Sequence, residues 1–305
     1  MVGEPDRSRY ALLAARLGGR FVSVTPLTGG VSTPTDLLIY ENDDVFTRVV
    51  VRGMSALPTK DAGPGSMERM SALLQELRHH RMPVQEPLLT DDGEIMGAPI
   101  IVLEYVTGSA DHPDPAVAVP EMARLLLRVH ALPVGRAGDG GLVDLGLPAA
   151  QRPHEEARRL LERLLPAPEV DLLVREPAPP RDPPVLVHGD FWPGNVLWRQ
   201  GELVGLIDWE DAAIGDPELD LATARVELTL ALGPDEAETF RRHYEARSRR
   251  GIDQRRVDLW TVCSAAGMLL GVSQWGLSPD HEAHVRRVAR QVLDETLERL
   301  AHESP

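Results

Sequence analysis

The first third of the chain carries short runs in which apolar and β-branched residues alternate with polar ones, separated by glycines and an Asn-Asp pair. This pattern predicts three antiparallel strands near residues 21–27, 34–40 and 45–52, because side chains in a strand point to alternate faces. A more continuous apolar run predicts a further strand over 97–108, preceded by one that starts at Met82. We therefore expect this part of the chain to form a small antiparallel sheet.

Most of the remaining chain repeats apolar residues every three or four positions, which is the spacing of a helix with one buried face. Counting the two helices in the first third, the predicted helices cover residues 8–17, 67–81, 120–132, 154–165, 217–232, 235–249, 254–274 and 280–301. Residues 166–184 are rich in proline and are interpreted as a connection within the larger part of the molecule. Strands first and helices afterwards indicate the α+β class.

One stretch, residues 185–210, interrupts the helical part with three short apolar runs joined by tight turns. Polar residues stand at the ends of these runs, namely Asp190, Asn195 and Asp208. Phosphoryl transfer requires a divalent metal held against a triphosphate and an acceptor hydroxyl held in line. Mg²⁺ prefers oxygen ligands, usually one or two carboxylates together with phosphates and water. Two carboxylates and one carboxamide in this arrangement are therefore suited to phosphoryl transfer.

The order of residues in this stretch is more specific than the residue types alone. The segments HGDFWPGNVLW, GLIDWED and GDPELDLA follow one another, with Asn195 five residues after Asp190 and Asp208 thirteen residues after Asn195. This order resembles the aminoglycoside phosphotransferase family, which also contains macrolide and choline kinases and lies in the protein-kinase-like superfamily. The resemblance implies a two-lobed kinase-like fold: a small antiparallel β-sheet N-lobe over 1–104, a hinge at about 104–108, and a mostly helical C-lobe over 105–305.

The same resemblance implies an enzyme that moves the γ-phosphoryl group of a nucleoside triphosphate to a hydroxyl group of a small molecule. ATP is the expected donor, with GTP left open, and Mg²⁺ is the expected metal. Asp190 is assigned as the catalytic residue that orients and deprotonates the acceptor, and Asn195 and Asp208 as the metal ligands. His130 is expected to be structural, and Asp220 to brace the catalytic loop.

Further residues are assigned to the nucleotide by the same resemblance. A turn after the first strand combines glycines, which let the backbone approach phosphates, with hydroxyl side chains that can donate hydrogen bonds. Its expected phosphate-binding residues are Gly29, Gly30, Ser32 and Thr33. At the hinge, Glu104 and Val106 are expected to offer backbone groups to the adenine edge.

The third strand lacks the lysine that binds the α- and β-phosphates in kinases. The chain has one lysine, Lys60, which lies beyond that strand in a Pro/Gly-rich loop. The resemblance places Arg52 in this role, because the fork of arginine suits phosphate, while Arg48 on the same strand face is the alternative. Glu68, in the first turn of the next helix, would pair with Arg52, and Glu76 is the alternative partner.

The amino-acid composition limits the kinds of binding partner that are expected. The chain carries 47 acidic and 32 basic residues and a formal net charge of −15, which argues against nucleic acid as the main partner and is compatible with a cationic small substrate. Cys263 is the single cysteine, so no intrachain disulfide can form. The start has no apolar segment of a signal peptide, and no run of 18 apolar residues suggests a membrane span, so a cytoplasmic location is expected. The oligomeric state is not indicated.

Three alternatives accompany the main interpretation. A metabolic kinase for choline or another amino alcohol would share every motif, and an aromatic box for a cation would favour it. A catalytically silent nucleotide-binding protein would be compatible with arginine in place of lysine on the third strand. A protein kinase is disfavoured because His-Arg-Asp, Asp-Phe-Gly and Ala-Pro-Glu segments are missing from the sequence. The family resemblance alone leaves both the acceptor and a role in antibiotic resistance or metabolism open.

Overall fold

The computed structural model describes residues 6–27, 35–53, 65–135, 138, 141–150, 152–174 and 183–302. The chain divides into two compact units. The first comprises Met1–Gly108 together with Val204–Ile207, and the second comprises Ser109–Leu203 together with Asp208–Pro305. The first unit holds a five-stranded sheet and the second is mostly helical, which confirms the α+β, kinase-like class expected from the sequence.

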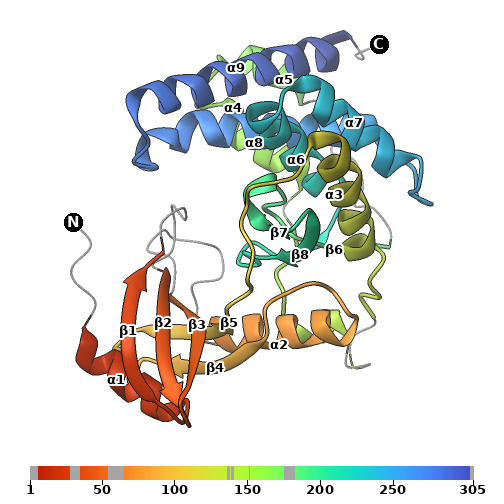
Figure 1. The fold of residues 1–305 in the computed structure, drawn as a ribbon. Coiled ribbons are helices and arrows are strands. Elements are labelled where there is room, and N and C mark those ends of the chain that lie inside the picture. The colour runs from red at the N-terminus through yellow and green to blue at the C-terminus, as the bar shows by residue number, and fades with distance from the viewer. Residues whose placement is uncertain are drawn as a thin grey trace. The chain divides into compact units, whose positions relative to one another are not determined.

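The sheet of the first unit is antiparallel throughout and has the order β1-β2-β3-β5-β4 (Figure 1). Its strands are β1 (Arg20–Pro26), β2 (Thr35–Asn42), β3 (Val45–Gly53), β4 (Pro87–Asp92) and β5 (Pro99–Glu104). The first three strands lie within two residues of the predicted ends, because short alternating runs between turn residues report directly on strands. β5 pairs with β3, so the sheet has β3 and β5 in its interior.

Two helices accompany this sheet, α1 (Arg7–Arg16) and α2 (Ser66–His79). Asp6 caps α1 by accepting a hydrogen bond from the backbone N–H of Ser8, which satisfies one of the free donors at the helix start. Tyr10 and Leu13 of α1 are buried against the sheet in one apolar cluster. The other fully or nearly fully buried members of this cluster are Ala14, Leu38, Tyr40, Val49, Val51, Ile100 and Val102.

Two strand boundaries predicted from the sequence were wrong. The segment that starts at Met82 is not a strand, because its backbone bonds locally: the N–H of Met82 bonds Leu77 O at 2.9 Å, and that of Val84 bonds Met82 O at 2.9 Å. Strand β4 begins only at Pro87. At the other end, β5 stops at Glu104 and does not extend to residue 108, because its pairing with β3 ends there.

The second unit contains most of the helices. These are α3 (Pro115–His130), α4 (Pro153–Leu161), α5 (Ala167–Leu173), α6 (Glu218–Ala231), α7 (Pro234–Glu245), α8 (Gln254–Gly271) and α9 (Pro279–His302), with the short 3₁₀ helices η1 (Leu142–Leu145), η2 (Pro193–Asn195) and η3 (Val272–Gln274). Two small two-stranded sheets complete the described elements: β6 (Val185–Val187) with β9 (Ala213–Gly215), and β7 (Val196–Arg199) with β8 (Glu202–Leu206).

Helix α5 corrects the interpretation of residues 166–184 as connection alone. Pro166 stands at its N-cap and Pro168 within its first turn, where proline is tolerated because the N–H groups there have no partner in the helix. Prolines in this segment therefore start a helix as well as break one. Strand β9 was also not predicted, since three residues are too short for a visible pattern of alternation.

Helix α8 forms the centre of the large core of the second unit, and it runs beside α9 (Figure 1). Leu259, Val262 and Ala266 of α8 are fully buried in one cluster with Leu293 of α9 and Ala222 of α6. Burial on nearly all sides explains why α8 reads as apolar along much of its length. Among the helices of the described residues, none is both long and apolar enough to cross a lipid bilayer.

Candidate active site

The loop with His188, Gly189 and Asp190 follows directly after the short strand β6. All three residues of β6 are buried, and the strand pairs in antiparallel register with β9, with Leu186 opposite Ile214. A β-branched, apolar strand in the interior fixes the position at which the polar loop begins. Asp190 is thereby held at the end of a rigid element.

Asp220, in the first turn of α6, holds the backbone of this loop. Its carboxylate is fully buried and accepts hydrogen bonds from the N–H groups of His188 and Gly189, each at 2.8 Å. Two backbone donors on one buried carboxylate make strong, charge-assisted hydrogen bonds. The bracing role that the resemblance implied for Asp220 is therefore seen directly in the structure.

A second contact fixes Asp220 from behind. Oδ2 of Asp220 lies 3.0 Å from Nε2 of His130, at the end of α3, and Nδ1 of the same ring lies 2.7 Å from the hydroxyl of Tyr244 on α7. His130 and Tyr244 are buried, and burial together with the nearby Glu218 and Asp220 carboxylates raises the pKa of Tyr244. This series of hydrogen bonds connects the helices α3, α6 and α7 to the catalytic segment. His130 is therefore structural, as expected.

Gly189 cannot carry a side chain here without movement of its surroundings. Its φ of +86° lies in the left-handed region that side chains disfavour. A Cβ atom at this position would also stand 2.3 Å from the backbone oxygen of Asp211. Glycine between His188 and Asp190 therefore lets two backbone segments of the site approach each other closely.

Asp190 and Asn195 contact each other directly. The Nδ2 atom of Asn195 donates to the backbone oxygen of Asp190 at 2.8 Å and to its Oδ2 at 2.9 Å. Asn195 lies at the end of η2 and is buried, so this arrangement is held inside the protein. Both amide hydrogens are used on Asp190, which leaves Oδ1 of Asn195 as the acceptor atom of the amide.

The environment of Asp190 favours its protonated form. Burial and the nearby carboxylates of Asp208 and Asp211 raise the pKa of Asp190 to about 7, while the hydrogen bond from Asn195 lowers it. A carboxyl group that titrates near neutral pH is suited to accept a proton from a substrate hydroxyl. The charge of Asp208 therefore acts on Asp190 within this site.

Asp208 has an unusual backbone conformation. Its φ is +68°, in the left-handed region, which aspartate adopts more readily than most residues but still at some cost. Such conformations persist only where the surrounding structure fixes them, and they gather at functional sites. The carboxylate of Asp208 is thereby presented on a sharp turn of the chain after β8.

The donor atoms of this cluster fit a hard divalent cation. Asn195 offers an amide oxygen, and Asp208 offers a carboxylate beside the carboxylate of Asp190. Such an all-oxygen set suits Mg²⁺, which commonly combines one or two protein carboxylates with phosphates and water, and does not suit metals that prefer nitrogen or sulfur.

A cavity of about 290 Å³ opens beside Asp190 within the second unit. Glu227 of α6 lines it, and burial together with the Asp190 carboxylate raises the pKa of Glu227 to about 8. Aromatic and polar walls come from α4, α6 and α8 and from the segment after α8. The other lining residues are Glu156, Gly189, Leu219, Thr223, Trp260, Cys263, Ser264, Gly267, Met268 and Trp275. The cavity is thus lined by two acids, Asp190 from the catalytic loop and the half-buried Glu227 from α6.

The two arginines that the sequence offered for phosphate binding lie on β3 in the first unit. Arg52 is half-buried and stands in register between Thr35 of β2 and Ile101 of β5. Arg48 is exposed; its guanidinium lies 4.6 Å from the centre of the Tyr105 ring, and its Nη2 lies 3.4 Å from the Thr107 hydroxyl. Arg48 therefore contacts the segment after β5, and the assignment of the phosphates to Arg52 stays a prediction.

The expected hinge residues differ in what their backbones do. Glu104 already uses both backbone groups, since its N–H bonds Glu86 O and its oxygen accepts from Gln85 Nε2, each at 2.8 Å. Val106 is half-buried and lies in the irregular segment after β5. Glu68 is exposed in the first turn of α2, as predicted from its position in the sequence. The role of each of these residues toward a nucleotide stays a prediction.

The predicted phosphate-binding turn, with Gly29, Gly30, Ser32 and Thr33, lies outside the described residues, as does Lys60. Glu227 is the residue of this site that the sequence analysis missed. A signal was present, because Glu227 is the only charged residue between Arg225 and Asp235 in an otherwise apolar helical segment. The apolar spacing of this segment predicted the helix correctly. The charge of Glu227 among these apolar residues was not interpreted as a sign of a functional acid.

Comparison with known proteins gives one family match that covers most of the chain. A profile of the phosphotransferase enzyme family matches residues 23–260. Homoserine kinase of Pseudomonas aeruginosa is 34% identical over 194 residues, which is 60% of this chain and 60% of the kinase. The match therefore spans less than two thirds of that relative.

Solved structures with a similar fold cover nearly the whole chain. A candidate aminoglycoside phosphotransferase from Ralstonia eutropha JMP134 superposes with a TM-score of 0.66 at 20% identity, covering 94% of this chain and 97% of that one. Choline kinase LicA from Streptococcus pneumoniae superposes with a TM-score of 0.57 at 18% identity, covering 90% of this chain and 94% of that one. A further structure of LicA contains AMP. At these identities the likeness establishes the fold.

Proposed function

The chain belongs to the phosphotransferase enzyme family, and on that premise we propose that it is a kinase that moves the γ-phosphoryl group of ATP to a hydroxyl group of a small molecule. The observation that carries the proposal is the contact of Asp190 with Asn195, beside Asp208 and at the mouth of the cavity that Glu227 lines. The AMP in LicA supports an adenine nucleotide as the donor.

Each of the three residues has a separate task in this proposal. Asp190 accepts a hydrogen bond from the acceptor hydroxyl, aligns its oxygen with the γ-phosphorus and takes its proton as the new P–O bond forms. Asn195 holds the Asp190 carboxylate in place and, with Asp208, would hold Mg²⁺. The metal would neutralise charge on the β- and γ-phosphates. Because the transition state is loose, the orientation of the hydroxyl contributes more than the basicity of Asp190.

The first unit supplies the remaining nucleotide contacts in this proposal. Arg52 would bind the α- and β-phosphates through its fork of N–H groups and Glu68 would steady it. The backbone of Val106 and the second lone pair of the Glu104 carbonyl oxygen would meet the adenine edge, because the N–H of Glu104 is already bonded to Glu86 O. The turn with Gly29, Gly30, Ser32 and Thr33 would cover the phosphates. These assignments rest on the family resemblance.

The acceptor proposed for this site is a small alcohol that also carries a protonated amine. Within the described part of the chain Glu227 makes no hydrogen bond or ion pair, although it is half-buried and lines the cavity. A buried carboxyl group without a partner is costly when ionised, and a ligand ammonium would supply that partner. The volume of about 290 Å³ suits an amino alcohol better than a large antibiotic. The similarity to LicA and to homoserine kinase agrees with acceptors of this class.

A nucleotide-consumption screen tests the proposal. The full-length chain, ATP and Mg²⁺ would be incubated with four acceptor sets: amino alcohols, the matching alcohols without an amine, aminoglycosides, and macrolides. Asp190→Asn is the matched inactive control. We expect ATP consumption above the Asp190→Asn background with an amino alcohol and a transferred phosphate in the product. Turnover with a macrolide or a neutral alcohol alone would overturn the acceptor class, and no turnover with any set, despite ATP binding, would favour the silent nucleotide-binding alternative.

A further inference from the structure

Helix α6 has a second cavity on its other side. Leu219, Thr223 and Glu227 line the cavity next to Asp190, whereas Leu221, Arg225 and Thr229 line the second one. The two sets are offset by two residues, which corresponds to about 200° around an α-helix, so they face in nearly opposite directions. The second cavity has a volume of about 390 Å³ and lies entirely within the second unit.

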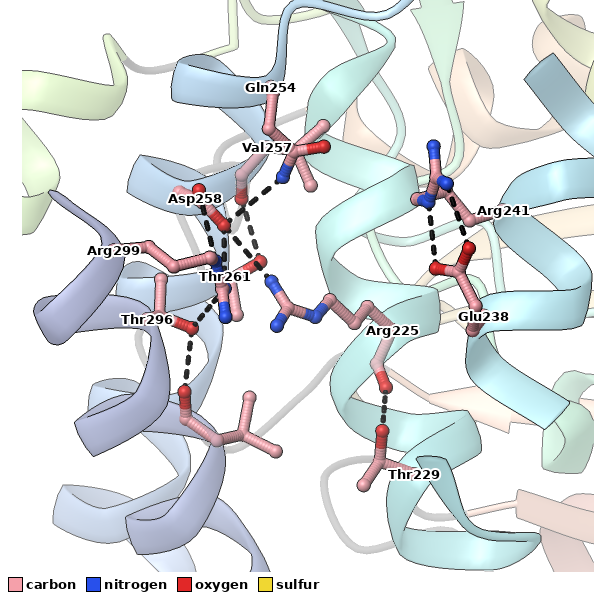
Figure 2. Close-up of polar contacts among 11 residues, drawn as sticks. Arg225, Thr229, Glu238, Arg241, Gln254, Val257, Asp258, Thr261, Thr296 and Arg299 are labelled. Carbon is pink, nitrogen blue, oxygen red and sulfur yellow. Dashed lines mark hydrogen bonds and ion pairs between the residues drawn. The ribbon is translucent and has the colours of Figure 1, made fainter. Parts of the chain in front are cut away.

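Four helices build this second cavity, namely α6, α7, α8 and α9. Apolar side chains form much of its lining: Leu221, Pro234, Ala237, Phe240, Val257 and Val292. Arg225 and Arg299 reach into the space between α6, α8 and α9 from opposite sides, as Figure 2 shows. The cavity therefore combines an apolar surface with two guanidinium groups that converge on one point.

The two arginines share one carboxylate. Asp258, which is fully buried, accepts from Nη1 of Arg225 at 3.1 Å and from Nη2 of Arg299 at 2.8 Å, both through Oδ1 (Figure 2). Nε of Arg299 is 3.4 Å from Oδ2 of the same carboxylate, and Nε2 of Gln254 is 3.3 Å from Oδ1. One negative charge therefore meets two positive charges at the inner end of the cavity.

The other charges around the cavity are matched or lie at its edge. Arg241 donates two hydrogen bonds to Glu238 (Figure 2) and a third to Glu245, so its charge is neutralised. Glu295 is exposed and accepts from Gln291 Nε2 at 2.9 Å. Solvent and salt screen such an exposed carboxylate more strongly than the inner groups. Glu295 also raises the pKa of Arg225 and so offsets part of the positive charge from its exposed position, while the inner end itself holds two arginines on one carboxylate.

Arg225 is the arginine with unused hydrogen-bonding capacity. Its side chain is 24% exposed, and its guanidinium makes one hydrogen bond, to Asp258, within the described residues. A guanidinium has five N–H donors in a planar fork. Burial and then the charge of Arg299 lower the pKa of Arg225, which agrees with a positive charge that is not fully compensated. The remaining donors border the cavity.

We propose that this cavity is a second ligand site, separate from the one next to Asp190, which binds a small carboxylate with an apolar body. The carboxylate accepts hydrogen bonds from Arg225 and Arg299 and places a second negative charge beside these two arginines. The apolar body packs on Phe240, Val257 and Val292. A carboxylate fits this pair because its two oxygens match the planar guanidinium fork, and a highly charged anion would lose more hydration on entering an apolar cavity.

Calorimetric titration of the full-length chain with hexanoate tests the site, with hexanamide as the neutral probe of the same length. We expect saturable binding of one hexanoate and no detectable binding of hexanamide. Arg225→Gln should weaken hexanoate binding at least about tenfold, which is the loss of one charge-assisted hydrogen bond. Arg290→Gln is the matched control, because Arg290 lies on α9 like Arg299 but is exposed and pairs only loosely with Asp294 at 3.7 Å.

Arg299→Gln serves as the second variant, because removal of Arg225 leaves Asp258 with one arginine fewer and could impair folding. Circular dichroism would confirm that each variant is folded before titration. Equal binding of hexanoate and hexanamide, or hexanoate binding retained in both Arg225→Gln and Arg299→Gln, would overturn the proposal. So would the lack of hexanoate binding by the unmodified chain. None of these titrations involves ATP or turnover, so their outcome is independent of the proposed kinase activity.

Discussion

The side-chain amide of Asn195 donates two hydrogen bonds to Asp190, one to the backbone oxygen at 2.8 Å and one to Oδ2 at 2.9 Å. The residue proposed to bind the metal thus also fixes the residue proposed to receive the proton. This contact makes the two functions interdependent: a change at Asn195 moves Asp190, whereas a change at Asp190 leaves the backbone half of the contact in place.

Asp190→Asn should preserve the fold and remove the proton acceptor. We expect kcat to fall by roughly 10²-fold or more, in line with general-base contributions, and the Kd for ATP to stay nearly unchanged. Steady-state kinetics with an accepted alcohol and calorimetric titration with ATP would measure both. Turnover close to that of the unmodified chain would mean that Asp190 has no catalytic task.

The pH dependence of activity should reflect the raised pKa of Asp190, about 7, caused first by burial and then by Asp208 and Asp211. Catalysis requires the ionised form, so kcat/KM should rise with pH up to about 7 and level off above it.

The contribution of Asp190 to the free energy of unfolding should change with pH in the opposite direction. Between the ordinary carboxyl pKa and 7 the folded state binds more protons at Asp190 than the unfolded state, so this residue's contribution falls as pH rises. The difference in unfolding free energy between the unmodified chain and Asp190→Asn, measured from pH 4.5 to 8, would show this trend, and a flat difference would contradict it.

Gly189 and Gly201 have nearly the same φ, so alanine substitutions at these two positions distinguish backbone strain from steric overlap with neighbouring atoms. Gly189 and Gly201 have φ of +86° and +82°, but a Cβ at Gly189 would stand 2.3 Å from Asp211 O, whereas a Cβ at Gly201 would meet nothing within 4 Å. Gly201→Ala should cost about 1 kcal/mol of unfolding free energy from backbone strain alone. Gly189→Ala should cost about 1–3 kcal/mol more, because it also overpacks the site, and should reduce activity. Urea unfolding of both variants checks this, and equal losses would show that the contact with Asp211 relaxes freely.

Glu227→Gln keeps the size of the side chain and removes the charge that would bind an ammonium group. We expect KM for an amine-bearing acceptor to rise about tenfold or more, and KM for ATP to stay within about twofold. Glu298→Gln, an exposed acid on α9, is the matched control and should change neither constant. The prediction fails if Glu227→Gln affects amine-bearing and neutral alcohols equally.

Arg52→Ala should weaken ATP binding by at least about tenfold, since charge-assisted hydrogen bonds to phosphate would be lost. Arg48→Ala should have a smaller effect, because Arg48 packs on Tyr105 and contacts Thr107. Calorimetric titration of both variants with ATP distinguishes them. A larger loss in Arg48→Ala would assign the phosphates to Arg48.

The sequence was most informative where chemistry and secondary structure coincide. Asp190, Asn195 and Asp208 stand beside short apolar runs at a fixed spacing, and in the structure Asn195 bonds Asp190 while the charge of Asp208 acts on it. Their roles stay predictions. The first three strands of the five-stranded sheet were predicted within two residues, because alternating runs between turn residues indicate strands directly. The start of β4 could not be predicted, because Met82 and Val84 are apolar and buried like strand residues while their backbones bond locally.

Tertiary arrangement explains what the sequence could not provide. Whether Glu227 faces solvent or a cavity depends on the packing of α6 against α8, and periodicity alone cannot decide it. The same holds for Arg225 and Arg299, which are 74 positions apart and meet only through Asp258. Local sequence patterns predict helices and strands. A carboxylate that two distant arginines share can be known only from the tertiary structure.

Helix α6 sets the distance between the catalytic loop and Glu227 within the second unit. Asp220 ties its first turn to the catalytic loop, and Glu227 stands seven residues further along, a rise of about 10 Å. In the proposed function, the distance between the reacting hydroxyl and the ammonium group of an acceptor would therefore be set by helix α6 and not by a loop. Substitutions at Thr223 or Glu227 can change which acceptor fits while the reacting end stays aligned. Insertion of one residue between Asp220 and Glu227 would instead rotate the acid by about 100° and remove it from the cavity altogether.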